Sequence, residues 1–301
     1  MARFAIAALT LLLGLAVGSA HAAPQCPRPA PAPRPGVRPV NSFAAGPRPQ
    51  AIAPGRGRCG WGLGLARGPT GTGTAFIVGN RREVITNLHV VDRACHGNLH
   101  FTFEHGFAGG RALSTQAATV VARGDYCVEL ARGRHDYGGD WAIAILRSDP
   151  VALEPAAPAA EVAPLEPQIA GNRRDADPRY YLLGYSMSFR AGSRPFSAGP
   201  CRLGPLFAAG VVEHDCDAGP RTSGAPILGE GPGGQCLVGA MHVGEIEHRP
   251  GRPLYRAGVN ANVAVLASRF AAAVDAVAQG LARGRDADAI ALDLAAGAPP
   301  R

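Results

Sequence analysis

The chain has 301 residues, of which 47% are hydrophobic and only 6% aromatic, and it contains 40 glycines and 27 prolines. This composition favours short strands joined by many turns over long helices. The formal net charge of +7 comes from arginines scattered along the sequence, without the clustering on one surface or among aromatics that nucleic-acid binding requires, so we expect no nucleic-acid partner.

The first 22 residues have the pattern of a signal peptide. Arg3 precedes an apolar run over residues 4–17, and the segment ends on the cleavage signal Ala20-His21-Ala22. No later stretch offers about 18 uninterrupted apolar residues. The sequence therefore predicts a secreted or periplasmic protein that makes no membrane contact after signal cleavage.

Residues 23–57 are dominated by Pro, Ala, Arg and Gly. They contain little that could be buried, so we expect a disordered linker or a pro-segment there. A folded region is predicted over residues 58–283, long enough for one two-barrel domain or two ordinary small domains. Residues 284–301 are predicted to be a flexible tail.

Short apolar runs of strand length recur within the folded region. Clusters of Gly, Pro, Asp or Asn separate most of them, which is typical of an all-β sandwich or barrel. The runs cover residues 73–78, 84–86, 99–103, 117–123, 141–146, 179–183, 210–213, 237–242 and 257–260. One long helix is predicted over residues 263–282, because Val265, Phe270, Val274 and Val277 recur at helical spacing.

The seven cysteines are expected to form disulfides, because thiols of exported proteins tend to pair. No two cysteines form a C-x-x-C motif, so the pattern does not indicate a zinc site. Cys26 lies in the proline-rich segment and is the odd one, which leaves six for three bridges. Cys201 and Cys216 are equally far from residues 208–209, and a hairpin turning there would place them opposite each other.

Three separated segments could supply the groups that acyl transfer needs: a nucleophile, an imidazole base and a buried carboxylate. His89 comes shortly after the strand-like run over residues 84–86, at a point where the chain leaves the sheet. It is one of nine histidines and is distinguished by this context. Asp140 opens the apolar strand 141–146, and a carboxylate beside a core strand needs a partner, although it could equally cap the preceding Gly-Gly turn.

Ser223 lies in a tight loop and is followed by Gly224, Pro226 and an apolar strand. In such a loop the preceding backbone N–H groups can converge on an oxyanion. The Ser-Gly-x-Pro pattern alone is common turn chemistry. Ser223 becomes a candidate nucleophile because His89, Asp140 and Ser223 occur in this order within one domain of short strands.

These segments resemble the trypsin-like serine peptidases, particularly the bacterial glutamyl-endopeptidase-like branch. Residues 86–91 are similar to the motif around that group's histidine, 140–146 to its aspartate motif, 223–226 to its Ser-Gly-x-Pro motif and 239–244 to its pocket strand. The resemblance covers about residues 59–273. It implies an all-β fold of two orthogonal six-stranded antiparallel β-barrels with a C-terminal α-helix.

The resemblance also implies the activity of a serine endopeptidase that acts through an acyl-enzyme. His89 would deprotonate Ser223, and Asp140 would orient the imidazole. The partner would be a polypeptide substrate, with no cofactor or metal, and the protein is expected to be a monomer. The backbone N–H groups of Arg221 and Ser223 would form the oxyanion hole, although Arg221 replaces the usual glycine, whose backbone freedom is greater.

The resemblance gives two conflicting indications of the preferred substrate. His242 matches the histidine that faces a substrate carboxylate in glutamyl endopeptidases, and imidazole can donate a hydrogen bond or carry charge. Asp217, six residues before Ser223, lies by count where trypsins keep the acid that receives Lys or Arg. Ala218 replaces a threonine that is frequent in the glutamyl branch. Each residue could instead have a purely structural role, and the strand context favours His242.

Two other functions fit parts of the sequence. Ser186 follows a strand in a Gly-x-Ser pattern like the nucleophile elbow of esterases, but Ser188 stands where that elbow has glycine. A catalytically silent binding module with the same barrels would explain Arg221. Retention of His89, Asp140 and Ser223 favours the enzyme over this module.

Overall fold

The protein is described here by a computed structural model, which covers residues 38–39, 50–51, 62–133, 136–150, 161–162, 180–230, 236–247, 254–255 and 260–296. The predicted signal peptide lies outside these ranges, as does the predicted linker over 23–57 except for β1 (Arg38–Pro39) and β2 (Gln50–Ala51). None of the helices in the described ranges is long and apolar enough to span a membrane.

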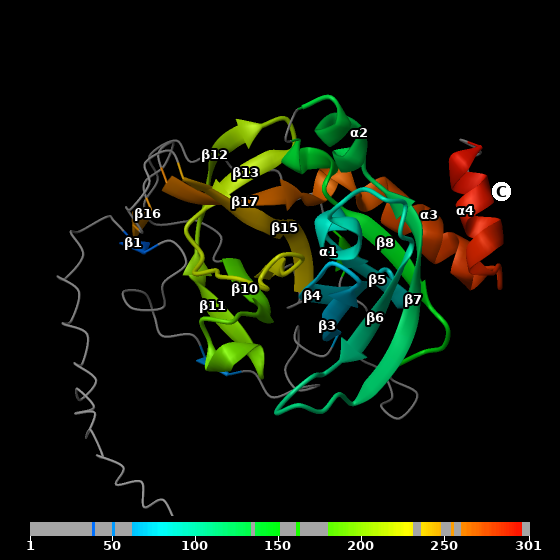
Figure 1. Cartoon of the computed structure of the whole chain (residues 1–301), viewed down its shortest axis with the longest axis horizontal. Helices are drawn as coiled ribbons and strands as arrows, with labels where there is room; N and C mark the ends of the chain where they lie inside the picture. Colours follow the sequence, from blue (N-terminus) through cyan, green and yellow to red (C-terminus); the bar gives the residue numbers. More distant parts are fainter. Residues whose placement is uncertain are drawn as a thin grey trace, which may run out of the picture. The chain divides into compact units, whose positions relative to one another are not determined.

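Six strands in the N-terminal half of the described region form a closed barrel in the order β3-β4-β5-β8-β7-β6 (Figure 1). Their bounds are β3 Leu63–Gly68, β4 Gly71–Val78, β5 Asn80–Thr86, β6 His100–His105, β7 Ser114–Arg123 and β8 Ala142–Leu146. Neighbouring strands pair antiparallel. Fully buried aliphatic side chains such as Leu65, Ile85 and Ile143 fill the interior, as expected for short β-branched and apolar strands.

A second sheet has the strand order β12-β13-β17-β15-β14-β10-β11-β2. Its strands are β10 Tyr180–Tyr185, β11 Pro195–Cys201, β12 Leu203–Ala208, β13 Val211–His214, β14 Pro226–Glu230, β15 Cys236–Glu247 and β17 Asn260–Leu266. Strands β11 and β12 lie near opposite ends of this order, yet only Arg202 separates them in the chain. The sheet therefore curls back on itself, and the molecule has the predicted fold of two β-barrels. Two short strands complete the set: β9 (Glu161–Val162) pairs with β15, and β16 (Leu254–Tyr255) pairs with β1.

Disulfides connect neighbouring segments in both halves. Cys201 and Cys216 are bonded across the β12–β13 hairpin, with their Cα atoms 4.9 Å apart. Cys95, which follows helix α1, is bonded to Cys127 in helix α2. Cys236 is disulfide-bonded as well.

The helices differ from the sequence prediction at their ends. The described helices are α1 Leu88–Asp92, α2 Tyr126–Ala131, α3 Ala271–Ala282 and α4 Ala287–Ala295, with 3-10 turns η1 Tyr137–Gly139, η2 Arg190–Gly192 and η4 Ala267–Arg269. The predicted helix over 263–282 begins too early. Val263 and Val265 belong to β17, where they pair with β13 and β15, so the strand predicted at 257–260 in fact runs over 260–266.

Helix α4 lies in the segment for which a flexible tail was predicted. Asp286 caps it by accepting a hydrogen bond from the Ala289 N–H at 2.8 Å. Ile290 is buried against Gly280 of α3, where an added Cβ would come within 2.7 Å of the Ile290 side chain. The cap, the packing of α4 on the core and an ion pair between Arg285 and Asp293 thus order a sequence that looks featureless.

A buried carboxyl group lies where α3 covers the first barrel. Glu83 of β5 is fully buried, and neither of its side-chain oxygens has a hydrogen-bond partner in the described structure. Burial raises its pKa to about 9, the Asn80 backbone opposes this shift, and the charge of Asp275 adds a smaller upward contribution. Glu83 is therefore protonated at neutral pH, because an unpaired buried charge would be too costly.

This raised pKa predicts how Glu83→Gln changes stability with pH. Between about pH 4.5 and 9 the unfolded chain releases the proton that the folded chain retains, so the free energy of unfolding of the wild type falls as pH rises. The amide that replaces the carboxyl group is neutral throughout. The free energy of unfolding of the variant, relative to that of the wild type, should therefore rise by up to about 1.4 kcal/mol per pH unit in this window. Urea unfolding at pH 5 and pH 8 measures this difference. Asp288→Asn, at an exposed acid, is the control, and an equal difference at both pH values would contradict the assignment.

Candidate active site

His89 lies in the short helix α1, immediately after β5. Thr86, the last residue of β5, is buried and donates its Oγ1 hydrogen bond to the Thr74 carbonyl at 2.7 Å. Leu88 and Val91 are fully buried and hold the helix against the barrel. The His89 side chain remains 23% exposed, so the strand end presents an imidazole at the surface of the barrel.

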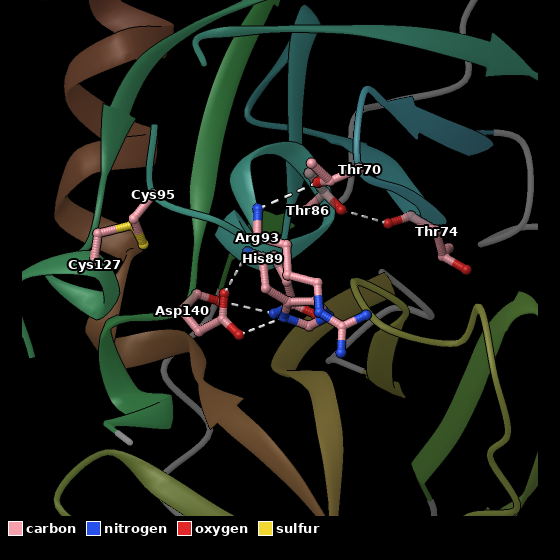
Figure 2. Close-up of polar contacts among 9 residues, drawn as sticks. Thr70, Thr74, Thr86, His89, Arg93, Cys95, Cys127 and Asp140 are labelled. Carbon is pink, nitrogen blue, oxygen red and sulfur yellow. Dashed lines mark hydrogen bonds and ion pairs between the residues drawn. A yellow bond between two sulfur atoms is a disulfide. The ribbon is translucent and has the colours of Figure 1, made fainter. Parts of the chain in front are cut away.

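Asp140 lies beside His89 because β5 and β8 are antiparallel neighbours, with Thr86 opposite Ala142. Its carboxylate is 1% exposed and makes two contacts with His89, which Figure 2 shows. Oδ1 accepts from the His89 backbone N–H at 2.9 Å, and Oδ2 lies 2.6 Å from Nδ1 of the ring. Asn87 donates its side-chain N–H to the Asp140 backbone carbonyl at 2.7 Å. The carboxylate is thus compensated by hydrogen bonds from His89.

Four influences set the pKa of His89. Burial lowers this pKa, but the negative charge of Asp140 and its hydrogen bond together raise it above the ordinary value, while the charge of Arg93 lowers it. With Nδ1 donating to the carboxylate, the neutral ring has an unprotonated Nε2. The pair can therefore accept a proton at Nε2 and stabilise the resulting imidazolium.

Ser223 lies in the loop between β13 and β14, and the loop is fixed from both sides. On the first barrel, Thr74 donates its backbone N–H to the Ser223 carbonyl at 2.8 Å and its Oγ1 to the Arg221 carbonyl at 3.1 Å. On the second, Gly224 donates to the His242 carbonyl at 2.9 Å. Gly224 has φ +85°, and a Cβ there would lie 2.1 Å from the Thr74 carbonyl oxygen, so only glycine fits.

The Ser223 backbone and the helix carrying His89 meet at Gly73. A Cβ on Gly73 would lie 2.8 Å from the Ser223 carbonyl oxygen and 2.6 Å from a methyl group of Val90, the residue after His89. The structure therefore brings the three predicted residues to one place. Within the described ranges, the Ser223 hydroxyl forms no hydrogen bond with His89.

Two backbone N–H groups beside Ser223 are available to a ligand. Thr222 and Gly224 donate within the protein, whereas the N–H groups of Arg221 and Ser223 donate to no acceptor in the described part of the chain. The Pro220 carbonyl accepts from the Met187 N–H at 2.8 Å. Because a peptide is planar and trans, the Arg221 N–H of that same peptide points the opposite way.

Arg221 adopts φ +77°, a backbone conformation that glycine reaches without strain. For a non-glycine residue this conformation costs about 1–2 kcal/mol. Arginine therefore takes the backbone shape expected of glycine at this position, and its N–H remains free.

His242 of β15 is 3% exposed and contacts a second histidine. Its Nδ1 lies 3.0 Å from Nε2 of His214 on β13, across the intervening strand β17. Burial, then the charge of His89, lowers the pKa of His242 to about 3. Burial, then His242, lowers the pKa of His214 as well. Both rings are therefore neutral, and one donates to the other.

His214 was missed by the sequence reasoning. It ends the short strand Val211–His214 and carries no motif of its own. Asp217 is 6% exposed and directly follows the disulfide-bonded Cys216. Asn262 of β17 donates to the Cys216 carbonyl at 2.8 Å, which holds this end of the loop against the sheet that carries both histidines.

Ser186 is not placed as a nucleophile. It is fully buried, and its Oγ accepts a hydrogen bond from the Ser188 N–H at 3.2 Å. A turn follows β10 at this point, in place of the helix that a nucleophile elbow requires. No group of three or more His, Cys, Asp or Glu side chains among the described residues could hold a metal ion.

Comparisons with known proteins concern the family and the fold. The profile of the trypsin-like peptidase domain matches residues 73–236, more than half of the chain. A Glu endopeptidase structure is similar, with a TM-score of 0.52 at 11% identity over 79% of this chain and 97% of that chain. A thermostable serine protease from an extremophilic microorganism has a TM-score of 0.47 at 17% identity over 71% of this chain and 96% of that chain. No curated protein matches the chain in sequence.

Removing the charge of Asp140 should lower the pKa of His89. In Asp140→Asn the negative charge that raises this pKa is lost and any remaining hydrogen bond is to a neutral acceptor, while burial and Arg93 still lower the pKa. NMR titration of the His89 ring protons measures the change. Asp149→Asn, which neutralises a carboxylate at the other end of β8, should leave the titration unaltered. An unchanged or higher pKa in Asp140→Asn would show that the carboxylate does not control the imidazole.

Proposed function

The chain belongs to the trypsin-like peptidase family, and from this membership we propose that it is a serine endopeptidase in which His89, Asp140 and Ser223 form the catalytic triad. The observation that carries the proposal is the His89–Asp140 pair, with Oδ2 and Nδ1 2.6 Å apart. This pair lies beside a serine loop whose backbone N–H groups at Arg221 and Ser223 are free. A peptidase of this fold needs both features.

In the proposed mechanism, His89 Nε2 takes the proton of the Ser223 hydroxyl as Oγ attacks the carbonyl carbon of the scissile peptide. The negative charge that develops on the carbonyl oxygen is bound by the N–H groups of Arg221 and Ser223. His89 then protonates the leaving amine, and the acyl-enzyme forms. In the second step His89 takes a proton from water, which attacks the ester, and then returns the proton to Ser223 Oγ. Asp140 stabilises the imidazolium in both acylation and deacylation. Every step uses groups of this chain.

His242 is the proposed pocket residue. Its Nδ1 is occupied by His214 at 3.0 Å, which fixes the orientation of the ring. Nε2 of His242 has no partner within the described ranges and is free to bond a substrate group. A neutral imidazole that donates from Nε2 suits the carboxylate of Glu or Asp, so we infer cleavage after acidic residues. Asp217 is the alternative, and it would favour cleavage after Lys or Arg.

We further propose that the protein is exported to the extracellular space or the periplasm. The Cys95–Cys127 and Cys201–Cys216 disulfides support this, because such bonds persist in oxidising compartments. The predicted signal peptide over residues 1–22 would direct export. Residues 23–57 would be either a pro-segment or a spacer, and the N-terminus of the active protein distinguishes the two.

Ser223→Ala should abolish peptidase activity without unfolding the protein. Losing the nucleophile lowers kcat by about 10⁴-fold or more in enzymes of this type. The midpoint of thermal unfolding should stay close to that of the wild type, because the hydroxyl makes no hydrogen bond within the described structure. Ser186→Ala is the matched control and should keep its activity.

A fluorophosphonate probe tests the same assignment independently of any substrate. Folded, processed wild type should be labelled on Ser223, and Ser223→Ala should not. Absence of labelling in the wild type would favour the catalytically silent module. A Ser223→Ala variant retaining more than a few per cent of the activity would refute the triad.

A library of peptide substrates tests the pocket. Cleavage after Glu or Asp is expected, and His214→Gln should reduce kcat/KM for these substrates, because the ring of His242 loses the partner that orients it. Cleavage after Lys or Arg would transfer the pocket role to Asp217. Cleavage after apolar residues would exclude both.

A further inference from the structure

An arginine without a partner lies beside the catalytic imidazole. Arg93 follows α1, four residues after His89 and hence on the same face of the helical turn. Its backbone N–H donates to Thr70 Oγ1 at 3.3 Å, and its side chain is exposed. Figure 2 shows the guanidinium beside the His89 ring, in agreement with the effect of its charge on that ring. No acid of the described ranges pairs with it.

A second unpaired arginine lies beside the nucleophile. The side chain of Arg221 runs along the β10–β11 loop, where its Nη1 is 2.9 Å from the position that a Cβ on Gly192 would take. Arg190 and Arg194 lie in the same loop and are exposed. Within the described part of the chain, none of these three arginines has an acidic partner.

The contacts of the Ser223 loop show which side of the substrate these arginines face. Gly224, after Ser223, bonds to β15, which carries the proposed pocket residue His242. Pro220, before Ser223, bonds to Met187 at the start of the β10–β11 loop. The pocket strand and the arginine-bearing loop therefore hold opposite ends of the nucleophile loop. If the pocket strand receives the residue before the scissile bond, the loop faces the residues after it.

Arg93 faces the same side of the substrate for a chemical reason. His89 must protonate the leaving amine, so Nε2 points toward the residues that follow the scissile bond. Arg93 lies next to that ring. The free guanidinium groups of Arg93 and Arg221 thus border the leaving-group side of the site, one on each barrel.

We propose that Arg93 and Arg221 form a subsite that selects substrates with an acidic residue at the first or second position after the scissile bond. This inference rests on the proposed peptidase function. A carboxylate there would meet two guanidinium groups that have no other acid to bind. An exposed pair of this kind contributes up to about 1 kcal/mol, so each arginine would raise kcat/KM up to about fivefold.

The test compares two peptides that are identical except for Asp or Asn after the scissile bond. These residues have nearly the same shape, so the ratio of their kcat/KM values measures the charge preference. Wild type should cleave the Asp peptide about fivefold or more faster, and 1 M NaCl should reduce the ratio because salt screens exposed pairs. Arg93→Gln should lower the ratio, because it should lose more kcat/KM for the Asp peptide than for the Asn peptide.

Arg283→Gln removes the same charge from an exposed position after α3 and should keep the wild-type ratio. Arg221→Gly keeps the backbone N–H and suits φ +77°, so its ratio should also fall. A wild-type ratio of one, or an equal ratio in Arg93→Gln, would overturn the subsite while leaving the peptidase intact. If neither peptide is cleaved and Ser223 resists the fluorophosphonate, the peptidase function fails and the subsite with it.

Discussion

The candidate site depends on one buried threonine that joins the two barrels. Thr74 of β4 is fully buried, and its backbone and hydroxyl groups form hydrogen bonds with residues distant in sequence. Its N–H and Oγ1 donate to the carbonyls of Ser223 and Arg221. Its Oγ1 also accepts from the Tyr185 N–H at 3.0 Å, and its carbonyl accepts from Thr86 Oγ1. The backbone and side chain of Thr74 thus connect the Ser223 loop to β5, which leads into the helix that carries His89. An unmet hydrogen bond at such a buried position would be costly.

In the proposed mechanism, the chemical roles are divided between the barrels. The first supplies both members of the acid–base pair, His89 and Asp140, from adjacent strands β5 and β8. The second supplies Ser223 and the paired imidazoles of His214 and His242. The relative orientation of base and nucleophile is therefore a property of the contact between barrels, whereas the geometry of the pair and of the pocket is set within each one. Small residues at the contact, such as Gly73, let the backbones approach closely.

The sequence predicted the elements whose signal is local. It did not predict features that depend on which strands pair with each other. Runs of β-branched residues and the segments around His89, Asp140 and Ser223 are readable because each is contiguous. The start of α3 was misplaced because Val263 and Val265 fit a strand and a helix equally well, and only their pairing in β17 separates the two. His214 could not be found, because its contact with His242 exists only through the order of three strands.

The Cys95–Cys127 disulfide makes the geometry of the proposed site dependent on redox conditions. Cys95 follows α1, which carries His89, and Cys127 lies in α2, which packs against the turn η1 that leads directly into Asp140. One covalent bond therefore connects the segments that position His89 and Asp140, across 32 residues of chain. Folding in a reducing compartment would leave those supports joined by non-covalent contacts alone. If the proposed triad is correct, oxidation of the protein helps to build the catalytic geometry as well as to stabilise the fold.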